Sequence, residues 1–185
     1  MKKGTIIAGT ILMLGVGTVL KAQDTNRDIT VVHDDNPLRL YRDQEFTVDF
    51  FGGGTLNEHD VNHINGSRIH EDGRLGLGGG GSFFFVRNLG IEGEVYTENP
   101  QGHFIDETSG SLVLRVPLGE GGLAPYIFGG GGHLFDPVPS NFGQAGAGLE
   151  YRFSPHFGVF VDGRWVITEN IGNYGMGRAG LRLAF

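Results

Sequence analysis

The sequence contains no cysteine, few charged residues and, after its first 22 residues, no long apolar run. The absence of cysteine excludes disulfide bonds, thiolate metal sites and a cysteine nucleophile. Because no later stretch offers about 20 consecutive apolar residues, no transmembrane helix is expected in the rest of the chain. Proline occurs only 7 times and glycine follows no three-residue period, so a collagen-like structure is excluded as well.

Glycine is abundant, with 34 of 185 residues, and 14 phenylalanines make a wholly disordered chain improbable. Glycine runs occupy positions 52–54, 78–81 and 129–132. A phosphate-binding loop would need a following Lys-Ser or Lys-Thr, which these runs lack. A dinucleotide-binding turn would need a helix after the glycines, and the sequence predicts none. We therefore interpret these glycines as structural residues of β-strands.

The N-terminal residues have the pattern of a secretory signal peptide. Lys2 and Lys3 precede an uncharged, mostly apolar stretch over positions 5–20, and Ala22 provides a small residue at a cleavage point. The alternative is an uncleaved membrane anchor, for which this stretch is short. Removal of residues 1–22 changes the formal net charge from −7 to −10, because they hold three lysines and no acidic residue. Such an acidic mature chain is not expected to bind nucleic acid.

The remaining chain alternates between apolar and polar residues, as strands do, and shows no helical periodicity. We predict eight strands, over residues 45–55, 72–85, 89–98, 109–117, 124–134, 143–153, 157–167 and 175–185. Longer connections are expected at 56–71, 99–108, 135–142 and 168–174, with short turns between them. This alternation is typical of a barrel that enters the outer membrane from the periplasm. We expect residues 23–44 to form a polar periplasmic tail, with a short helix as the alternative.

The two faces of the predicted strands differ in chemistry, because one is apolar and the other collects charges. The expected ion-pair network of the charged face comprises Asp49, Arg74, Glu92, Glu94, Arg115, Glu150, Arg152, Asp162, Arg164, Arg178 and Arg182. So many charges would be too costly in a soluble core, but they suit the lumen of a membrane barrel whose apolar face meets lipid. Phe51, Phe84, Tyr96 and Phe160 share the charged face. Since an eight-stranded barrel is just wide enough for side chains to fill it, we predict an all-β, antiparallel, up-and-down transmembrane barrel with a plugged lumen.

Three stretches, at 124–132, 146–159 and 175–185, resemble the small outer-membrane β-barrel family that includes OmpX, the OmpA membrane domain and the opacity proteins. The resemblance covers residues 45–185. It implies an integral protein of the Gram-negative outer membrane, and it implies that Phe185 is the signal read by the barrel-assembly machinery. The expected aromatic girdle at the lipid interface comprises Tyr126, Tyr151, Phe153, Phe157 and Trp165. We expect a monomer without cofactor, whose partners are membrane lipid and an extracellular ligand of its loops.

Two groups of residues suggest other chemistry. His59, His63 and His70 lie among acidic residues in the expected loop 56–71, which would suit a divalent metal, but we interpret this loop as solvated and predict no metal site. Glu98, Ser111 and His133 are the residue types of a hydrolase triad near one end of neighbouring strands, without a nucleophile motif. We therefore expect a non-enzymatic protein that presents surface loops for envelope structure or adhesion. An outer-membrane lipid-modifying hydrolase is the alternative, and a solute channel is disfavoured.

Overall fold

A computed structural model describes residues 40–56, 60–61, 68–69, 75–98, 104–119, 121–136, 139–169 and 172–185. The predicted signal peptide at 1–22 and the segment 23–39 lie outside the described residues. The strands are β1 (Glu45–Leu56), β2 (Asp60–Val61), β3 (Arg68–Ile69), β4 (Leu75–Val86), β5 (Leu89–Thr97), β6 (Glu107–Arg115), β7 (Leu123–Leu134), β8 (Ser140–Arg152), β9 (Phe157–Thr168) and β10 (Tyr174–Ala184).

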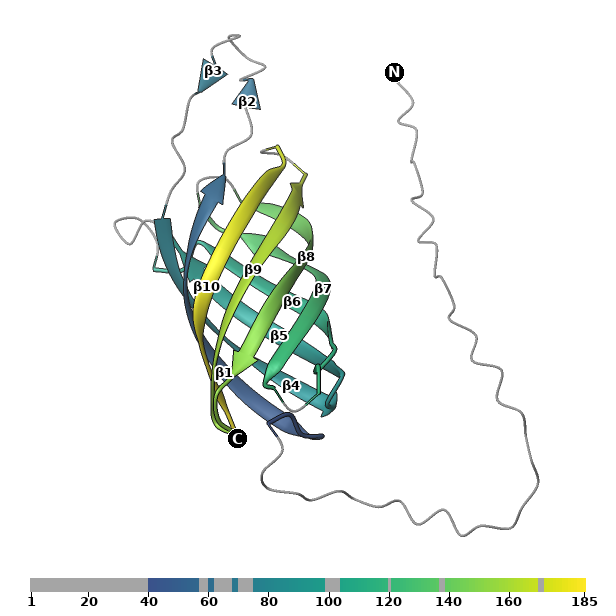
Figure 1. Ribbon diagram of the computed structural model, residues 1–185. Helices are drawn as coiled ribbons and strands as arrows, with labels where there is room; N and C mark the ends of the chain where they lie inside the picture. The colour runs from purple at the N-terminus through teal and green to yellow at the C-terminus, as the bar shows by residue number, and fades with distance from the viewer. Residues whose placement is uncertain are drawn as a thin grey trace, which may run out of the picture. The chain divides into compact units, whose positions relative to one another are not determined.

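Eight of these strands close into one barrel, in the order β1-β10-β9-β8-β7-β6-β5-β4, with β4 pairing again with β1 (Figure 1). Every pair is antiparallel, and the seam joins the first strand to the last, where Asp49 lies opposite Arg182. The predicted fold, an eight-stranded antiparallel barrel, is confirmed. Among the described residues, no helix is long and apolar enough to cross a membrane.

The ends of the strands differ from the prediction by a few residues. β4 begins at Leu75, the first described residue after the gap 70–74, and β8 begins at Ser140 and not at 143. The connection from Val116 to Gly122 has seven residues, whereas those after β7 and β9 have five each, so the predicted alternation of long and short connections is wrong there. Gly119 and Gly122 have φ values of 61° and 76°, and this left-handed backbone lets the seven residues turn within a small space.

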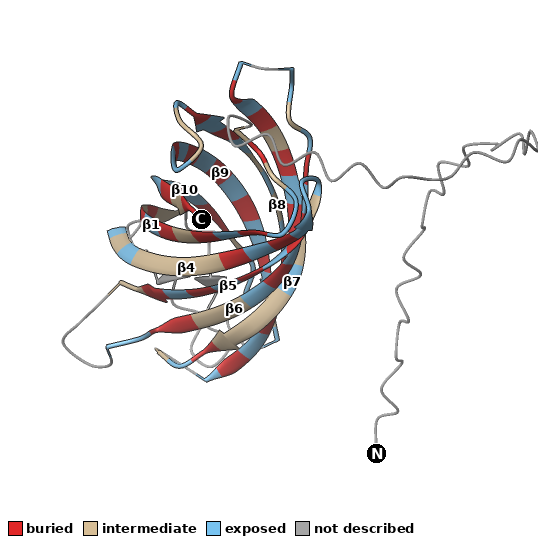
Figure 2. Ribbon diagram, turned by 90° about the horizontal axis from the view of Figure 1, so that it is seen from below, coloured by how far each residue is buried: buried red, intermediate tan, exposed pale blue. Residues whose placement is uncertain are grey.

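Buried and exposed residues alternate along the strands, as the colours of Figure 2 show. On β9, for example, Phe157, Val159 and Val161 are exposed, whereas Phe160 and Asp162 are buried. The outer surface is therefore rich in large apolar side chains, and the interior holds charged ones. A soluble barrel has the reverse arrangement, so the apolar outside suits lipid.

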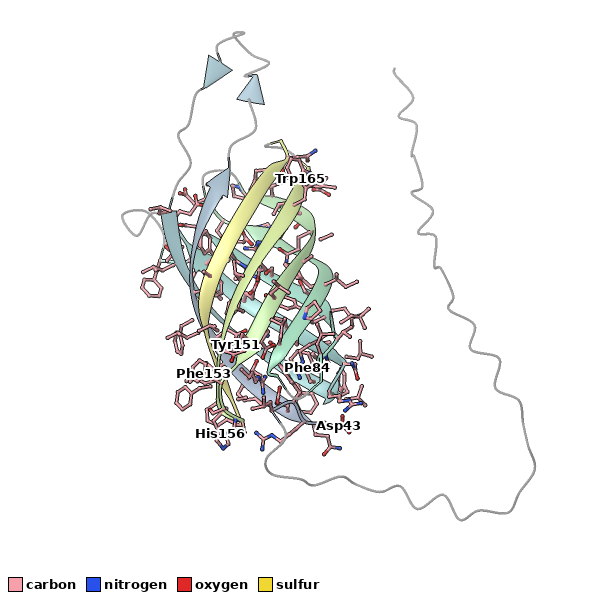
Figure 3. The ribbon with its side chains drawn as sticks, viewed as in Figure 1. Asp43, Phe84, Tyr151, Phe153, His156 and Trp165 are labelled. Carbon is pink, nitrogen blue, oxygen red and sulfur yellow. The ribbon has the colours of Figure 1, made fainter. Side chains whose placement is uncertain are left out.

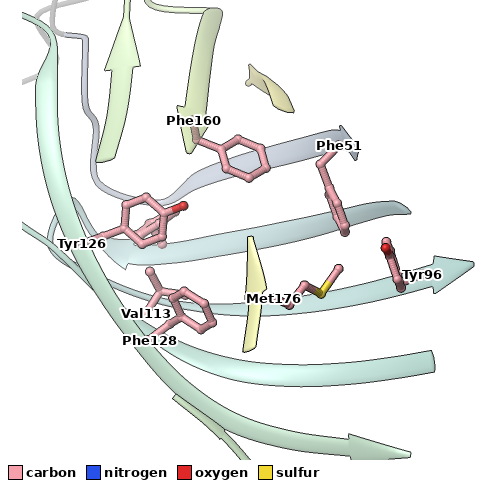
Figure 4. Packing of buried hydrophobic residues seen from close by; sticks show 8 residues of the cluster. Phe51, Tyr96, Val113, Tyr126, Phe128, Phe160 and Met176 are labelled. Carbon is pink, nitrogen blue, oxygen red and sulfur yellow. The ribbon is translucent and has the colours of Figure 1, made fainter. Parts of the chain in front are cut away.

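Aromatic side chains from several strands pack together inside the barrel (Figure 4). The buried cluster consists of Phe51, Phe84, Tyr96, Val113, Tyr126, Phe128, Phe160 and Met176. Glycines on facing strands make room for these rings. A Cβ added to Gly148 would lie 2.6 Å from Cζ of Tyr126 and 2.6 Å from Cβ of Asp162. Inward-facing glycines therefore let a narrow barrel hold large side chains.

Candidate functional site: the charged interior

The interior charges form two clusters, and each of the five described lumen arginines bridges at least two carboxylates. In the first cluster, near the short turns, Arg152 donates to both oxygens of Glu45, at 2.6 and 2.7 Å, and through Nε to Glu150 at 2.6 Å. Arg115 bridges the same two carboxylates at 3.1 and 3.4 Å. Arg182 extends the cluster from Glu150, at 2.8 Å, to the seam.

At the seam, the Arg182 guanidinium donates Nε to Oδ1 of Asp49 at 2.8 Å and Nη2 to Oδ2 at 2.6 Å. The same Nη2 lies 3.5 Å from Glu92, which also accepts a hydrogen bond from the Ser82 hydroxyl. The planar fork of arginine suits such two-bond pairing, which fixes geometry as well as charge. Inside the barrel, this ion pair therefore adds a side-chain contact to the backbone ladder that joins the first and last strands.

The second cluster lies toward the opposite end of the barrel, where β5 is connected to β6 and β9 to β10. Arg178 donates two hydrogen bonds to Asp162, both at 2.8 Å, and pairs with Glu94. Arg164 lies 3.3 Å from Glu94 and 3.2 Å from Glu107. Because all of these side chains are almost fully buried, each charge is compensated where water cannot reach it.

Ten of the eleven residues expected in the network are buried in the interior, and Arg74 lies outside the described residues. Two carboxylates that were not among the expected residues, Glu45 and Glu107, are also buried and paired with arginine. Both stand at strand ends, Glu45 as the first residue of β1 and Glu107 as the first of β6. The inward-facing residues of a strand recur at every second position, and this period leads back along the chain from Asp49 to Glu45 and from Ser111 to Glu107.

The prediction that Tyr126 belongs to the lipid-facing girdle is wrong. Its side chain is 4% exposed, and its hydroxyl donates a 2.7 Å hydrogen bond to Asp162 inside the barrel. The register places Tyr126 opposite Gly148, whose missing side chain leaves space for the ring. A tyrosine near the end of a strand can face either the lipid interface or the lumen, and the pairing of β7 with β8 places Tyr126 in the lumen.

The other expected girdle residues lie on the outer surface. Tyr151 and Phe153 are exposed near one end of the barrel, and Trp165 is exposed near the other (Figure 3). Phe157 is exposed as well. The rings of Phe153 and Phe157 are stacked with their centroids 6.4 Å apart. Phe185 is also exposed, next to Phe46 of the first strand. Their placement fits an aromatic belt at one boundary of the apolar surface, with Trp165 at the other boundary.

The candidate hydrolase triad is not assembled. Ser111 points into the interior, where its Oγ accepts a 2.9 Å hydrogen bond from the Gln144 amide. His133 lies on the opposite face of β7, and its Nδ1 is 3.0 Å from Oδ1 of Asn141. A nucleophile and its base must lie within hydrogen-bonding distance, and here the sheet separates them.

The candidate metal ligands of loop 56–71 lie almost wholly outside the described residues, including His59, His63 and His70. Metal binding by this loop therefore stays an untested alternative. Within the described part of the chain, no group of three or more histidine and acidic residues has the geometry to hold a metal ion.

The residues before β1 lie against the barrel, so a free tail is the wrong description for residues 40–44. Tyr41 is buried, and its hydroxyl donates a 2.7 Å hydrogen bond to the Gly122 carbonyl. Its ring lies 4.5 Å from the guanidinium carbon of Arg115 and 4.7 Å from that of Arg152, within the range of cation–π contacts. Burial, and next the Glu150 carboxylate, raises the pKa of Tyr41, which keeps the hydroxyl a neutral donor.

Comparisons with known proteins give similarity in structure only. No known family model matches the chain, and no curated protein sequence is significantly similar to it. The N-terminal β-barrel domain of Pseudomonas aeruginosa OprF matches with a TM-score of 0.57 and 16% identity, over 78% of this chain and 99% of that one. The outer-membrane protein OprG of the same organism matches with a TM-score of 0.58 and 11% identity, over 80% and 99%.

The attachment invasion locus protein Ail of Yersinia pestis matches with a TM-score of 0.52 and 15% identity, over 77% of this chain and 99% of that one. At such identities the likeness concerns the fold. The resemblance expected from the sequence is thereby confirmed at that level, and the chain has the fold of the small eight-stranded outer-membrane β-barrels.

Proposed function

We propose that this chain is a non-enzymatic integral protein of the Gram-negative outer membrane. In this proposal its barrel is a closed anchor that presents the connections at one end to the cell surface. The observation that carries the proposal is the division between an apolar outer face and an ion-paired interior. Val161 and Asp162 are neighbours on β9, yet the first is 54% exposed and the second is buried and held by Arg178. Only a surrounding apolar solvent makes such an arrangement favourable.

The filled interior supports an anchor more than a channel. Arginine–carboxylate pairs and aromatic rings from different strands fill the interior together. Arg182 and Arg178 also lie over these rings, with the Arg178 guanidinium carbon 4.7 Å from the centroid of Phe51. Passage of an ion would require several of these contacts to break together, which makes a solute channel the less favoured function.

The surface role would reside in the long connections, because loops on a rigid barrel carry most of the variable contacts of such proteins. Envelope structure, adhesion or another surface interaction with an extracellular ligand are the roles that this arrangement fits. Membrane lipid would surround the barrel, and the exposed Phe185 would be recognised by the barrel-assembly machinery during biogenesis. One chain supplies all eight strands, so we propose a monomer.

A lipid-modifying hydrolase is not favoured, since Ser111 and His133 lie on opposite faces of the sheet. Mass spectrometry of lipid A from cells that express the chain would test this reading. We expect an unchanged lipid A, and a new product that disappears in Ser111→Ala would contradict a non-enzymatic role.

Cell fractionation combined with gel migration tests the proposed location and fold together. We expect the full chain, expressed in a Gram-negative host, in the outer-membrane fraction, with a band that shifts on boiling because the folded barrel resists detergent. A protein in the soluble extract whose band does not shift would contradict the proposal. In the native host, a deletion strain compared for envelope permeability and surface binding would then identify the surface role.

A further inference from the structure

Charged residues at one mouth of the barrel are shielded from water although they stand at the very ends of their strands. Glu45 is the first residue of β1, and Arg115 and Arg152 are the last residues of β6 and β8. Each is only 1% exposed. Side chains at an open barrel mouth would contact water, so something must cover them.

The cover is the short segment 40–44 that precedes β1. The Tyr41 ring lies over both arginines, and Arg152 also donates a 2.8 Å hydrogen bond to the carbonyl of Leu40. On the other side of Arg115 lies the ring of Phe84, 3.7 Å from its guanidinium carbon. Arg115 is therefore held between an aromatic ring of the segment and an aromatic ring of the barrel wall.

The backbone of the segment is shaped to cross the mouth. Gln44 has a φ of 52°, which makes it the one described non-glycine residue in the left-handed region, and the chain turns there before it enters β1. Asp43, the residue before Gln44, accepts a 2.7 Å hydrogen bond from the backbone N–H of Arg87, which lies in the turn between β4 and β5. The Tyr41 hydroxyl reaches the β6–β7 connection through Gly122. The segment thus joins β1 to two other connections of the same mouth.

We propose that residues 40–44 are a stopper that seals this mouth, and that Tyr41 is the residue that keeps water from the ion pairs beneath it. This inference rests on the proposed membrane barrel, and it identifies the mouth at which water can enter the lumen. The stopper lies directly over the ion pairs of the first cluster and controls their access to water at this mouth. Departure of Tyr41 would expose Glu45, Arg115 and Arg152 to water from the turn side.

Reporter cysteines test the stopper cleanly, because the natural chain contains no cysteine. Thr47, the next inward residue of β1 after Glu45, is fully buried, which makes Thr47→Cys a reporter beneath Tyr41. The probe is the charged thiol reagent trimethylammonium-ethyl methanethiosulfonate, added to the full chain in lipid nanodiscs, where both mouths face water. We expect slow labelling with Tyr41 in place and a rate at least about tenfold higher in Tyr41→Ala.

Three further variants complete the design. Tyr41→Phe keeps the ring over the arginines and should protect the reporter, whereas Tyr41→Leu should not. Gly121→Cys places a thiol on an exposed turn with nothing within 4 Å, and it should react equally fast whichever residue is at position 41. Rapid labelling of Thr47→Cys with Tyr41 present would overturn the inference, and so would labelling in Tyr41→Ala and Tyr41→Leu that is as slow as with Tyr41 in place.

Migration on gels before and after boiling, measured on every variant, separates the two hypotheses. Variants that shift on boiling are folded barrels, and their labelling rates then judge the stopper alone. If the unsubstituted chain does not shift, the proposed membrane barrel fails, whatever the labelling rates show.

Discussion

Arg182 and Asp49 face each other directly across the seam of the barrel, 133 residues apart in the sequence, and are joined by two hydrogen bonds of 2.8 and 2.6 Å. A closed barrel must bring its first strand to its last, and loop closure over such a length has an entropic cost. The pair gives this junction a specific register, because a slip by one residue would turn Asp49 toward lipid.

Asp49→Asn is expected to destabilise the barrel by about 3 kcal/mol, because it leaves part of the buried charge of Arg182 uncompensated. Glu150 and Glu92 still contact Arg182, which keeps the loss below that of an isolated charge. The measurement is urea unfolding in phospholipid vesicles, followed by the fluorescence of Trp165, the single tryptophan. The matched control is Glu169→Gln, an exposed residue outside the strands, for which a change within about 0.5 kcal/mol is expected. Equal effects of the two variants would show that the seam pair does not stabilise the barrel.

Gly148→Ala is expected to lower the free energy of unfolding by about 1–3 kcal/mol, because the new methyl group would overlap the Tyr126 ring and Asp162 in a filled lumen. Gly177→Ala is the matched control on the outer face of β10, where an added Cβ has nothing within 4 Å. There we expect no loss, or a gain of up to about 1 kcal/mol from the stiffer unfolded chain. The same unfolding assay measures both, and a Gly148→Ala variant as stable as the parent would mean that the interior is looser than described.

Val161→Arg tests which solvent surrounds the barrel. Val161 lies in the middle of β9 on the outer face and is 54% exposed. In a bilayer, an arginine at this depth should cost about 2–4 kcal/mol, whereas Leu118→Arg in the β6–β7 connection should cost about 0–1 kcal/mol. Unfolding from vesicles measures the difference. If Val161→Arg is as well tolerated as Leu118→Arg, the apolar face does not lie in hydrocarbon.

Much of the fold is readable from the sequence because a membrane strand has two chemically different faces. Asp162 and Arg164 alternate with Val161 and Trp165, so the period of two shows both the strand and its inward side. The ends of strands are harder to predict, since alternation there meets polar turns on both faces. Glu45 and Glu107 were missed for that reason, although both continue the inward period of their strands.

Contacts between distant segments could not be predicted from a local pattern. Tyr126 faces the lumen, where its hydroxyl bonds Asp162 and its ring occupies the space that Gly148 leaves. These contacts depend on how β7 pairs with β8 and β8 with β9. Tyr41 sits in a polar stretch that resembles a tail, and its partners Arg115, Gly122 and Arg152 are 74 to 111 positions away. Nothing local marks such a residue as part of the barrel.

Conductance across a planar lipid bilayer tests the central claim, a membrane barrel whose lumen is closed by ion pairs and aromatic rings. The sample is the purified full chain after insertion, with insertion verified by gel migration that shifts on boiling. We predict a bilayer without stable unitary current steps, both for the parent chain and for Tyr41→Ala, because the cluster around Phe51 and Phe160 remains in both. Reproducible unitary steps from the inserted parent chain would contradict the closed lumen.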